Sequence, residues 1–249
     1  MLSARDLGLS GRLASIDTVL RPGEVTAICG PNGAGKSTLL ACLAGVLAPD
    51  TGEVALDGMA LAALPPRERA RAIGYLPQSP EVAWDVSVET LVSLGRIPWR
   101  GAPSEHGAAI DAAITAMDLS DLRHRPVSHL SGGERARVLM ARVLATRPRW
   151  LLADEPLANL DLGHAAALIA RFREQAAQGT GVVLVLHDLA SAMNHADRVL
   201  VLQGGALVVD DAPQEALAES VVSRVWGIEA NWLGEPGARA LAVRQAATP

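Results

Sequence analysis

One stretch constrains this chain more than any other: residues 30–38, which read Gly-Pro-Asn-Gly-Ala-Gly-Lys-Ser-Thr. The apolar residues 25–29 precede it and are typical of a short buried strand. Good helix formers follow over residues 39–44, and Gly45 ends them. A glycine-rich loop that joins a strand to a helix and ends in lysine and serine is the usual context of a phosphate-binding loop.

The chemistry of such a loop predicts nucleotide binding. Glycines allow successive backbone N–H groups to turn inward around an anion, and the positive end of the following helix faces the same anion. Lys36 would reach the β- and γ-phosphates, and the Ser37 hydroxyl would be a ligand of Mg²⁺. The candidate nucleotide-binding residues of the loop are Asn32, Gly33, Gly35, Lys36, Ser37 and Thr38.

Lys36 is the only lysine in the chain, and the other 21 of the 22 basic residues are arginines. A chance match to the loop pattern is the alternative to nucleotide binding. However, a planar guanidinium cannot replace a compact ammonium group that curls over a phosphate chain. A single lysine placed at this position therefore favours nucleotide binding.

Composition and charge exclude several classes of protein. A chain of 249 residues can bury a large core as one compact unit. Its net charge of −5 argues against a nucleic-acid-binding surface. The longest apolar runs, such as residues 182–186, are far shorter than the ~20 residues of a membrane span. No charged segment followed by an apolar one opens the chain, so we expect no signal peptide and a cytoplasmic location.

The two cysteines, Cys29 and Cys42, have no ligand spacing around them. We expect both to be small buried apolar residues rather than a disulfide or a metal pair. Any membrane role of the chain would then need a partner that does the spanning.

The hydrophobic pattern predicts an α/β fold. Residues 1–29 are expected to form strands, and the continuous apolar runs 149–153 and 181–186 favour central parallel strands covered on both faces. Apolar residues recur at helical spacing from about residue 86 to residue 146, which predicts an all-helical insertion. Residues 225–243 suggest two short strands around the turn at residues 234–237.

A second motif, residues 150–156, ends a buried strand with Asp154 and Glu155. The carboxyl end of such a strand meets the ligand crevice of an α/β sheet, and strand alternation would point the two acids in different directions. Asp154 can then hold the Mg²⁺ hydration shell while Glu155 orients or deprotonates the attacking water. The alternative is an ordinary solvated strand end.

A third motif, residues 130–134, reads Leu-Ser-Gly-Gly-Glu and directly precedes a helical run. Ser131 is a good helix N-cap, and Gly132 and Gly133 open the first turn. The segment is therefore a second candidate anion site at a helix N-terminus. An ordinary capped helix with glycines is the alternative.

These motifs, in this order and spacing, resemble the nucleotide-binding subunit of ATP-binding cassette (ABC) transporters over residues 1 to about 220. Gln78 matches the Q-loop, which the resemblance implies contacts Mg²⁺ or water and reports to a membrane partner. Leu160-Asp161 matches the D-loop, which crosses a dimer interface. His187 matches the switch histidine that contacts the γ-phosphate, so the resemblance implies Glu155, His187 and Gln78 as catalytic residues.

The resemblance also implies a mechanism. Ser131 and Gly133 contact the γ-phosphate held by the other subunit, so two ATP molecules with Mg²⁺ lie between two copies of the chain. ATP binding closes the dimer, and hydrolysis opens it. The helical insertion passes this motion to transmembrane permease subunits at the inner face of the membrane, and a periplasmic substrate-binding protein takes part indirectly.

The implied fold is a P-loop NTPase core with a mainly parallel sheet, an N-terminal antiparallel β subdomain and an inserted helical subdomain. Within one ABC ATPase domain, 1–249, we expect the core at 1–84 and 147–220, the helical subdomain at 85–146 and a β-like tail at 221–249.

Two departures from the family pattern stand out. Many members stack an aromatic residue on adenine, but residues 7–13 contain none, so adenine would rest on aliphatic carbon or on Arg12. The third motif continues with Glu134-Arg135, where many members have Gln.

The segment 94–99, Leu-Gly-Arg-Ile-Pro-Trp, is similar to one in importer ATPases for iron–siderophore, haem or cobalamin. This similarity favours import of a metal chelate. The alternatives are transport of another substrate class, a soluble ABC ATPase acting on ribosomes or DNA, and a regulator without turnover. The presence of Glu155 and His187 counts against a regulator without turnover.

Overall fold

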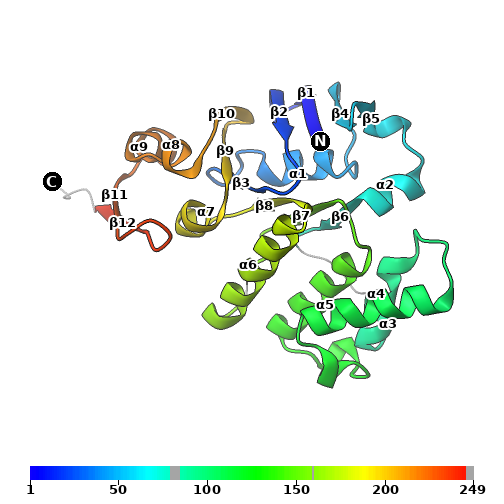
Figure 1. The fold of residues 1–249 in the computed structure, drawn as a ribbon. Helices are drawn as coiled ribbons and strands as arrows, with labels where there is room; N and C mark the ends of the chain where they lie inside the picture. Colours follow the sequence, from blue (N-terminus) through cyan, green and yellow to red (C-terminus); the bar gives the residue numbers. More distant parts are fainter. Residues whose placement is uncertain (79–84, 159, 245–249) are drawn as a thin grey trace.

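A mainly parallel sheet forms the centre of the molecule (Figure 1). The computed structural model describes residues 1–78, 85–158 and 160–244. The strand order is β10-β9-β3-β8-β7-β6. The strands are β3 (Val25–Cys29), β6 (Ile73–Leu76), β7 (Trp150–Asp154), β8 (Gly181–Val185), β9 (Arg198–Gln203) and β10 (Ala206–Asp211). Parallel pairing joins β9, β3, β8, β7 and β6, and every residue of β3, β7 and β8 is buried, as predicted.

A second, antiparallel sheet of order β2-β1-β4-β5 covers one face. Its strands are β1 (Leu2–Leu9), β2 (Leu13–Leu20), β4 (Thr51–Leu56) and β5 (Met59–Ala60). Helix α1 (Lys36–Leu43) lies between the two sheets, because Leu39 and Leu40 share one buried cluster with Leu7 of β1 and Val183 of β8. This arrangement confirms the predicted fold class.

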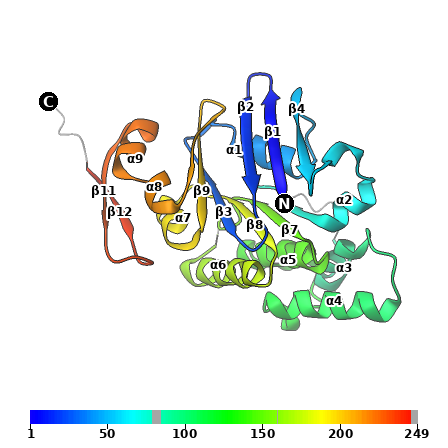
Figure 2. The ribbon, with the colours of Figure 1, turned by 45° about the horizontal axis from the view of Figure 1, so that its top comes forward.

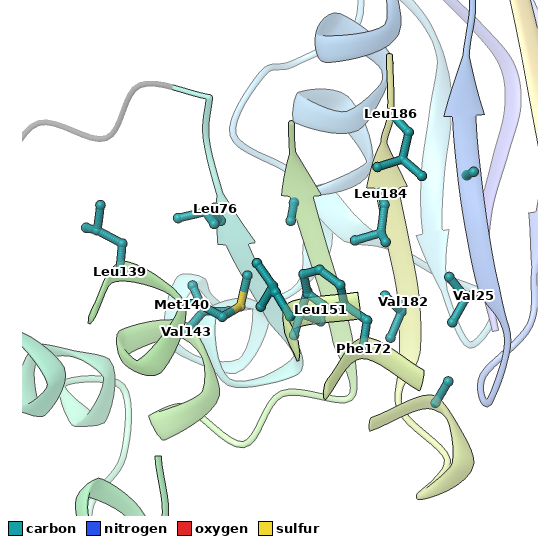
Figure 3. Packing of buried hydrophobic residues seen from close by; sticks show 14 of the residues in the cluster. Val25, Leu76, Leu139, Met140, Val143, Leu151, Phe172, Val182, Leu184 and Leu186 are labelled. Atoms are coloured by element: carbon teal, nitrogen blue, oxygen red, sulfur yellow. The ribbon is translucent and has the colours of Figure 1, made fainter. Parts of the chain in front are cut away.

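Helices cover the other face of the central sheet. Figure 3 shows Met140 and Val143 of α5 (Gly132–Ala145) beside Leu151 of β7, with Phe172 of α6 (Leu162–Ala177) next to them. Helix α7 (Leu189–His195) adds to the same cluster. Cys29 and Cys42 are buried and free, as expected.

The predicted helical insertion consists of α3 (Val88–Ser93), α4 (Pro103–Ala116) and α5, joined by 3₁₀ turns at Leu94–Arg96, Ser120–Leu122 and Val127–His129. Ser87 starts α3 by accepting a hydrogen bond from the Thr90 N–H at 3.2 Å. The insertion and the C-terminal hairpin lie at opposite ends of the central sheet (Figure 2).

The remaining elements are η1 (Leu61–Ala63), α2 (Pro66–Ala72), α8 (Pro213–Ala216), α9 (Glu219–Trp226), β11 (Glu229–Leu233) and β12 (Ala240–Arg244). The two predicted tail strands are present, but α9 extends through Trp226. The Trp232 indole N–H donates to the Leu217 carbonyl at 2.7 Å, which anchors the hairpin. No helix among the described residues is both long and apolar enough to cross a membrane.

Candidate nucleotide-binding site

The loop between β3 and α1 has the backbone that its glycines predict. Gly33 and Gly35 have left-handed φ values of 78° and 96°. A Cβ on Gly35 would lie 2.7 Å from the Arg12 carbonyl oxygen. Gly35 caps α1 without any side-chain hydrogen bond, so no capping side chain satisfies the first N–H groups of the helix. The helix begins at Lys36, three residues before the sequence pattern predicted.

Lys36, the first residue of α1, is held by hydrogen bonds to the loop. Its Nζ donates to the Gly30 carbonyl at 2.8 Å and to the Pro31 carbonyl at 2.9 Å, and the residue is only 6% exposed. Burial lowers the pKa of Lys36, and the charges of Glu155 and Asp154 act in the opposite direction. The two carboxylates therefore partly offset the effect of burial and favour the charged ammonium form, which suits phosphate.

Asp154 ends β7 and is 4% exposed. Its Oδ1 atom is buried and has no hydrogen-bond partner among the described residues. Burial raises the pKa of Asp154, whereas a hydrogen bond from the Ser37 side chain lowers it in part. A buried carboxylate oxygen with a free acceptor beside a serine hydroxyl is a donor set that suits Mg²⁺, so the residues fit this ion.

Glu155 lies just beyond the strand and has a left-handed φ of 50°. Strand alternation therefore does not set the direction of its side chain, and this part of the sequence argument was wrong. Its N–H donates to the Val185 carbonyl at 3.2 Å, and its Oε1 shares a hydrogen bond with His187 Nε2 at 2.5 Å. A non-glycine residue in this conformation costs of the order of 1–3 kcal/mol and is commonly found at functional sites.

A cavity of about 680 Å³ joins most of the predicted residues. Its walls are Gly11, Arg12, residues 32–38, Gln78, Glu155 and His187. An adjoining cavity of about 250 Å³ contains Asp154 together with Gln78, Glu155 and Gly132. Sequence reasoning missed Gly11, whose only local signal was its place in the turn before Arg12.

Three predicted residues, Ser131, Gly133 and Asp161, line neither of these two cavities. Ser131 caps α5: its Oγ accepts from the Glu134 N–H at 3.2 Å, and its own N–H donates to Glu134 Oε2 at 2.7 Å. Gly133 lies in the next turn, close to Leu160. Asp161 caps α6 by accepting from the His164 N–H at 2.8 Å.

The protein-family model described as "ABC transporter" matches residues 13–158. The chain belongs to the ABC transporter family. It is 42% identical to the hemin import ATP-binding protein HmuV of Myxococcus xanthus over 243 residues, which cover 92% of this chain and 91% of that protein. It is 41% identical to the protein of the same name from Pseudomonas entomophila over 229 residues, or 89% of each chain.

Solved ABC structures share the fold. The cbiO1 protein of Clostridium perfringens, part of an ABC transporter complex, gives a TM-score of 0.78 at 29% identity and covers 90% of this chain and 92% of its own. The ATP-binding cassette MJ0796 was solved as a dimer bound to ADP and phosphate. It gives a TM-score of 0.78 at 25% identity, and the match covers 86% of this chain and 99% of that chain. ATP-binding proteins of this family hydrolyse ATP, and this ABC protein is an ATPase.

Proposed function

We propose that this ABC ATPase energises the import of haem or a related metal chelate through a separate membrane permease. The hemin import proteins at 41–42% identity support the substrate class. Segment 94–99 also resembles importers of iron–siderophore and cobalamin, so these chelates are the nearest alternatives. The observation that carries the catalytic role is the Glu155–His187 hydrogen bond at the edge of the phosphate-loop cavity.

In the proposed mechanism, Lys36 and the backbone N–H groups of the loop hold the β- and γ-phosphates of ATP. Glu155 orients or deprotonates the attacking water, while His187 fixes the Glu155 carboxylate and contacts the γ-phosphate. Ser37, Gln78 and Asp154 would hold Mg²⁺, which when bound neutralises charge on the phosphates.

We also propose that each site needs a second copy of the chain. A Cβ on Gly132 would meet no atom of the described residues within 4 Å, and one on Gly133 would meet only Leu160, at an ordinary 3.7 Å. Neither glycine has a left-handed φ, so the packing of the described residues does not require glycine at these positions. Room for a partner's phosphate explains both glycines, with Ser131 and Gly133 contacting that phosphate and Asp161 lying at the interface.

The proposed partners are transmembrane permease subunits that contact the helical subdomain, 85–146, from the inner face of the membrane. A periplasmic substrate-binding protein would deliver the chelate to the permease. The core at 1–84 and 147–220 would supply the nucleotide site, and residues 221–249 would form the β-like tail.

The substrate class is tested with the permease that co-purifies with the chain. The complex is placed in lipid vesicles, and ATP hydrolysis is measured with hemin, a ferric siderophore or cobalamin. We expect one of these chelates to stimulate ATP hydrolysis. A complex that carries Glu155→Gln should show no hydrolysis with any of them. Stimulation by a sugar or an amino acid alone, or recovery of the chain only with ribosomes or DNA, contradicts the proposal.

The composite site is tested by mixing variants. Ser131→Arg and Lys36→Ala should each abolish hydrolysis as pure proteins, although both remain folded by circular dichroism. Their mixed dimer contains one site with an intact Lys36 and an intact Ser131, so mixing should restore part of the activity. A mixture as inactive as its components contradicts the use of Ser131 across the dimer.

A further inference from the structure

Trp99 lies between two arginines. The guanidinium carbons of Arg71 and Arg96 are 5.0 Å and 4.8 Å from the centre of its ring. Arg71 comes from α2, which precedes core strand β6, whereas Arg96 and Trp99 belong to the helical insertion. Arg71 Nε also donates to the Pro98 carbonyl at 2.7 Å. The stack therefore joins the core to the insertion through cation–π contacts and a hydrogen bond.

The same residues hold the C-terminal end of α5. Arg96 Nη1 donates to the Ala145 carbonyl at 2.8 Å, and the Trp99 indole N–H donates to the Thr146 carbonyl at 2.9 Å. The Thr146 hydroxyl donates to the Gly95 carbonyl at 3.1 Å. The last carbonyls of a helix lack partners within the helix and carry its negative dipole end, so donors and a cation are favourable there.

Close packing surrounds this end of α5. A Cβ on Gly74 of β6 would lie 2.7 Å from a methyl carbon of Val143. A Cβ on Gly95 would lie 2.1 Å from the Arg142 carbonyl oxygen. Neither position has room for a larger residue, so the C-terminal half of α5 is in direct contact with the core and with the turn before Trp99.

The rest of the insertion is less closely packed against the core. The N-terminal half of α5, including Gly132 and Ala136, borders the cavity of about 250 Å³ that contains Glu155. A cavity of about 240 Å³ separates Arg137 from α6, and one of about 370 Å³ lies between α4 and the C-terminal end of α6. The insertion is thus packed on the core through the C-terminal half of α5, whereas cavities border the N-terminal half of the same helix.

We propose that Trp99, held between Arg71 and Arg96, is the pivot of the helical insertion and positions the Ser131 end of α5. Helix α5 has 14 residues. It is therefore roughly 21 Å long, and a rotation of about 5° at one end moves the other by about 2 Å. Such a shift breaks a hydrogen bond to phosphate. The role of Ser131 rests on the proposed function, but the pivot itself does not.

The pivot is tested by the distance between two nitroxide labels, at Ser104→Cys on α4 and Ser220→Cys on α9, both exposed. Cys29 and Cys42 are buried, so the parent chain should not label. Arg71→Ala should broaden the distance distribution, whereas Arg67→Ala, an exposed arginine on the same helix, should leave it unchanged. Equal distributions in the two variants overturn the pivot.

A second measurement tests positioning. Arg71→Ala should lower kcat by about three- to tenfold, in the range expected for a residue that couples two sites. The affinity of the dilute chain for a fluorescent ATP analogue should stay unchanged, because Arg71 does not line the nucleotide cavity. Arg71→Lys keeps a cation near Trp99 and should recover part of kcat. A broadened distribution with an unchanged kcat overturns the positioning role.

The two proposals fail in different ways. The label distances need neither nucleotide nor a second subunit. Suppose that the Ser131→Arg and Lys36→Ala mixture stays inactive while Arg71→Ala broadens the label distances. The dimeric site would then be wrong, and the pivot would stand. Restored activity with unchanged distances would remove the pivot alone.

Discussion

The N-termini of α1 and α5 both carry glycines, and they are built differently. The loop before α1 has left-handed glycines and no side-chain cap, so the anion-binding end of α1 is left to a ligand. The loop before α5 has no left-handed glycine and is closed by the capping box of Ser131 and Glu134. The first N-terminus is arranged for an anion within one chain, whereas the second is satisfied by its own side chains.

The difference fits the proposal that one chain contains half of a site at each of two places. Gly30 and Gly35 of the first loop have positive φ values, and the carbonyls of Leu202 and Arg12 leave no room for a side chain there. In the second loop, a Cβ on Gly132 would meet no described atom within 4 Å, and one on Gly133 would make only an ordinary contact with Leu160. The packing of the chain therefore explains Gly30 and Gly35, whereas Gly132 and Gly133 fit the proposed contact with a partner's phosphate.

The largest expected effect separates binding from chemistry in the first region. Glu155→Gln should lower kcat by about 10³-fold, because an amide cannot accept a proton from water. Nucleotide affinity should persist, since the loop and Lys36 are unchanged, and the nucleotide-bound variant should accumulate as a dimer in light scattering. Glu174→Gln, at an exposed site on α6, is the control. Unchanged turnover in Glu155→Gln would remove Glu155 from its role.

The next largest effect tests whether ATP binding at the first loop requires the ammonium group of Lys36. Lys36→Ala and Lys36→Arg should both weaken ATP binding by about 10²-fold, because the site holds a compact, almost buried ammonium group. Isothermal titration with Mg-ATP measures this. Ser131→Ala should leave the affinity of the dilute chain unchanged. An equal loss of ATP affinity in the Lys36 and Ser131 variants would contradict the difference between the two loops.

Alanine at the two sets of glycines should change stability with opposite signs. Gly35→Ala introduces a side chain at φ 96° and 2.7 Å from a carbonyl oxygen. It should lower the free energy of unfolding by about 1–3 kcal/mol. Gly133→Ala adds a better helix former whose Cβ would make only an ordinary contact with Leu160, and it should raise the free energy of unfolding by about 0.5 kcal/mol. Urea unfolding measures both changes. If Gly133→Ala lowered the free energy of unfolding, the second loop would also lack room for a side chain.

The smallest effect concerns the cap of α5. The backbone hydrogen bond from Ser131 holds the pKa of Glu134 below its ordinary value of 4.5. The ionised carboxylate therefore stabilises the fold fully above pH 4.5, and this contribution is lost as pH falls through the lower folded-state pKa. Glu134→Gln keeps the capping geometry without the charge. Its stability deficit, followed by thermal unfolding, should shrink on acidification, and a deficit independent of pH would refute the charged cap.

Local patterns in the sequence determined much of this protein. The phosphate loop, the two acids after β7, the Ser131 cap and the helical run of the insertion are each made of neighbouring residues, so periodicity and turn chemistry predict them. Residues 188–224 had weaker patterns, and α7, β9, β10, α8 and most of α9 were not predicted. The boundaries of the predicted subdomains stay predictions.

Only the tertiary structure decided the rest. Three features depend on strands that are distant in sequence: the left-handed Glu155, the Asp154 oxygen that has no partner among the described residues, and the place of Gly11 beside the phosphate loop. Segment 94–99 suggested a cargo class by resemblance, yet its half-buried tryptophan contacts two arginines of the chain itself. A local pattern specifies the conformation of its own segment, but which segments come together is set by burial of the whole core.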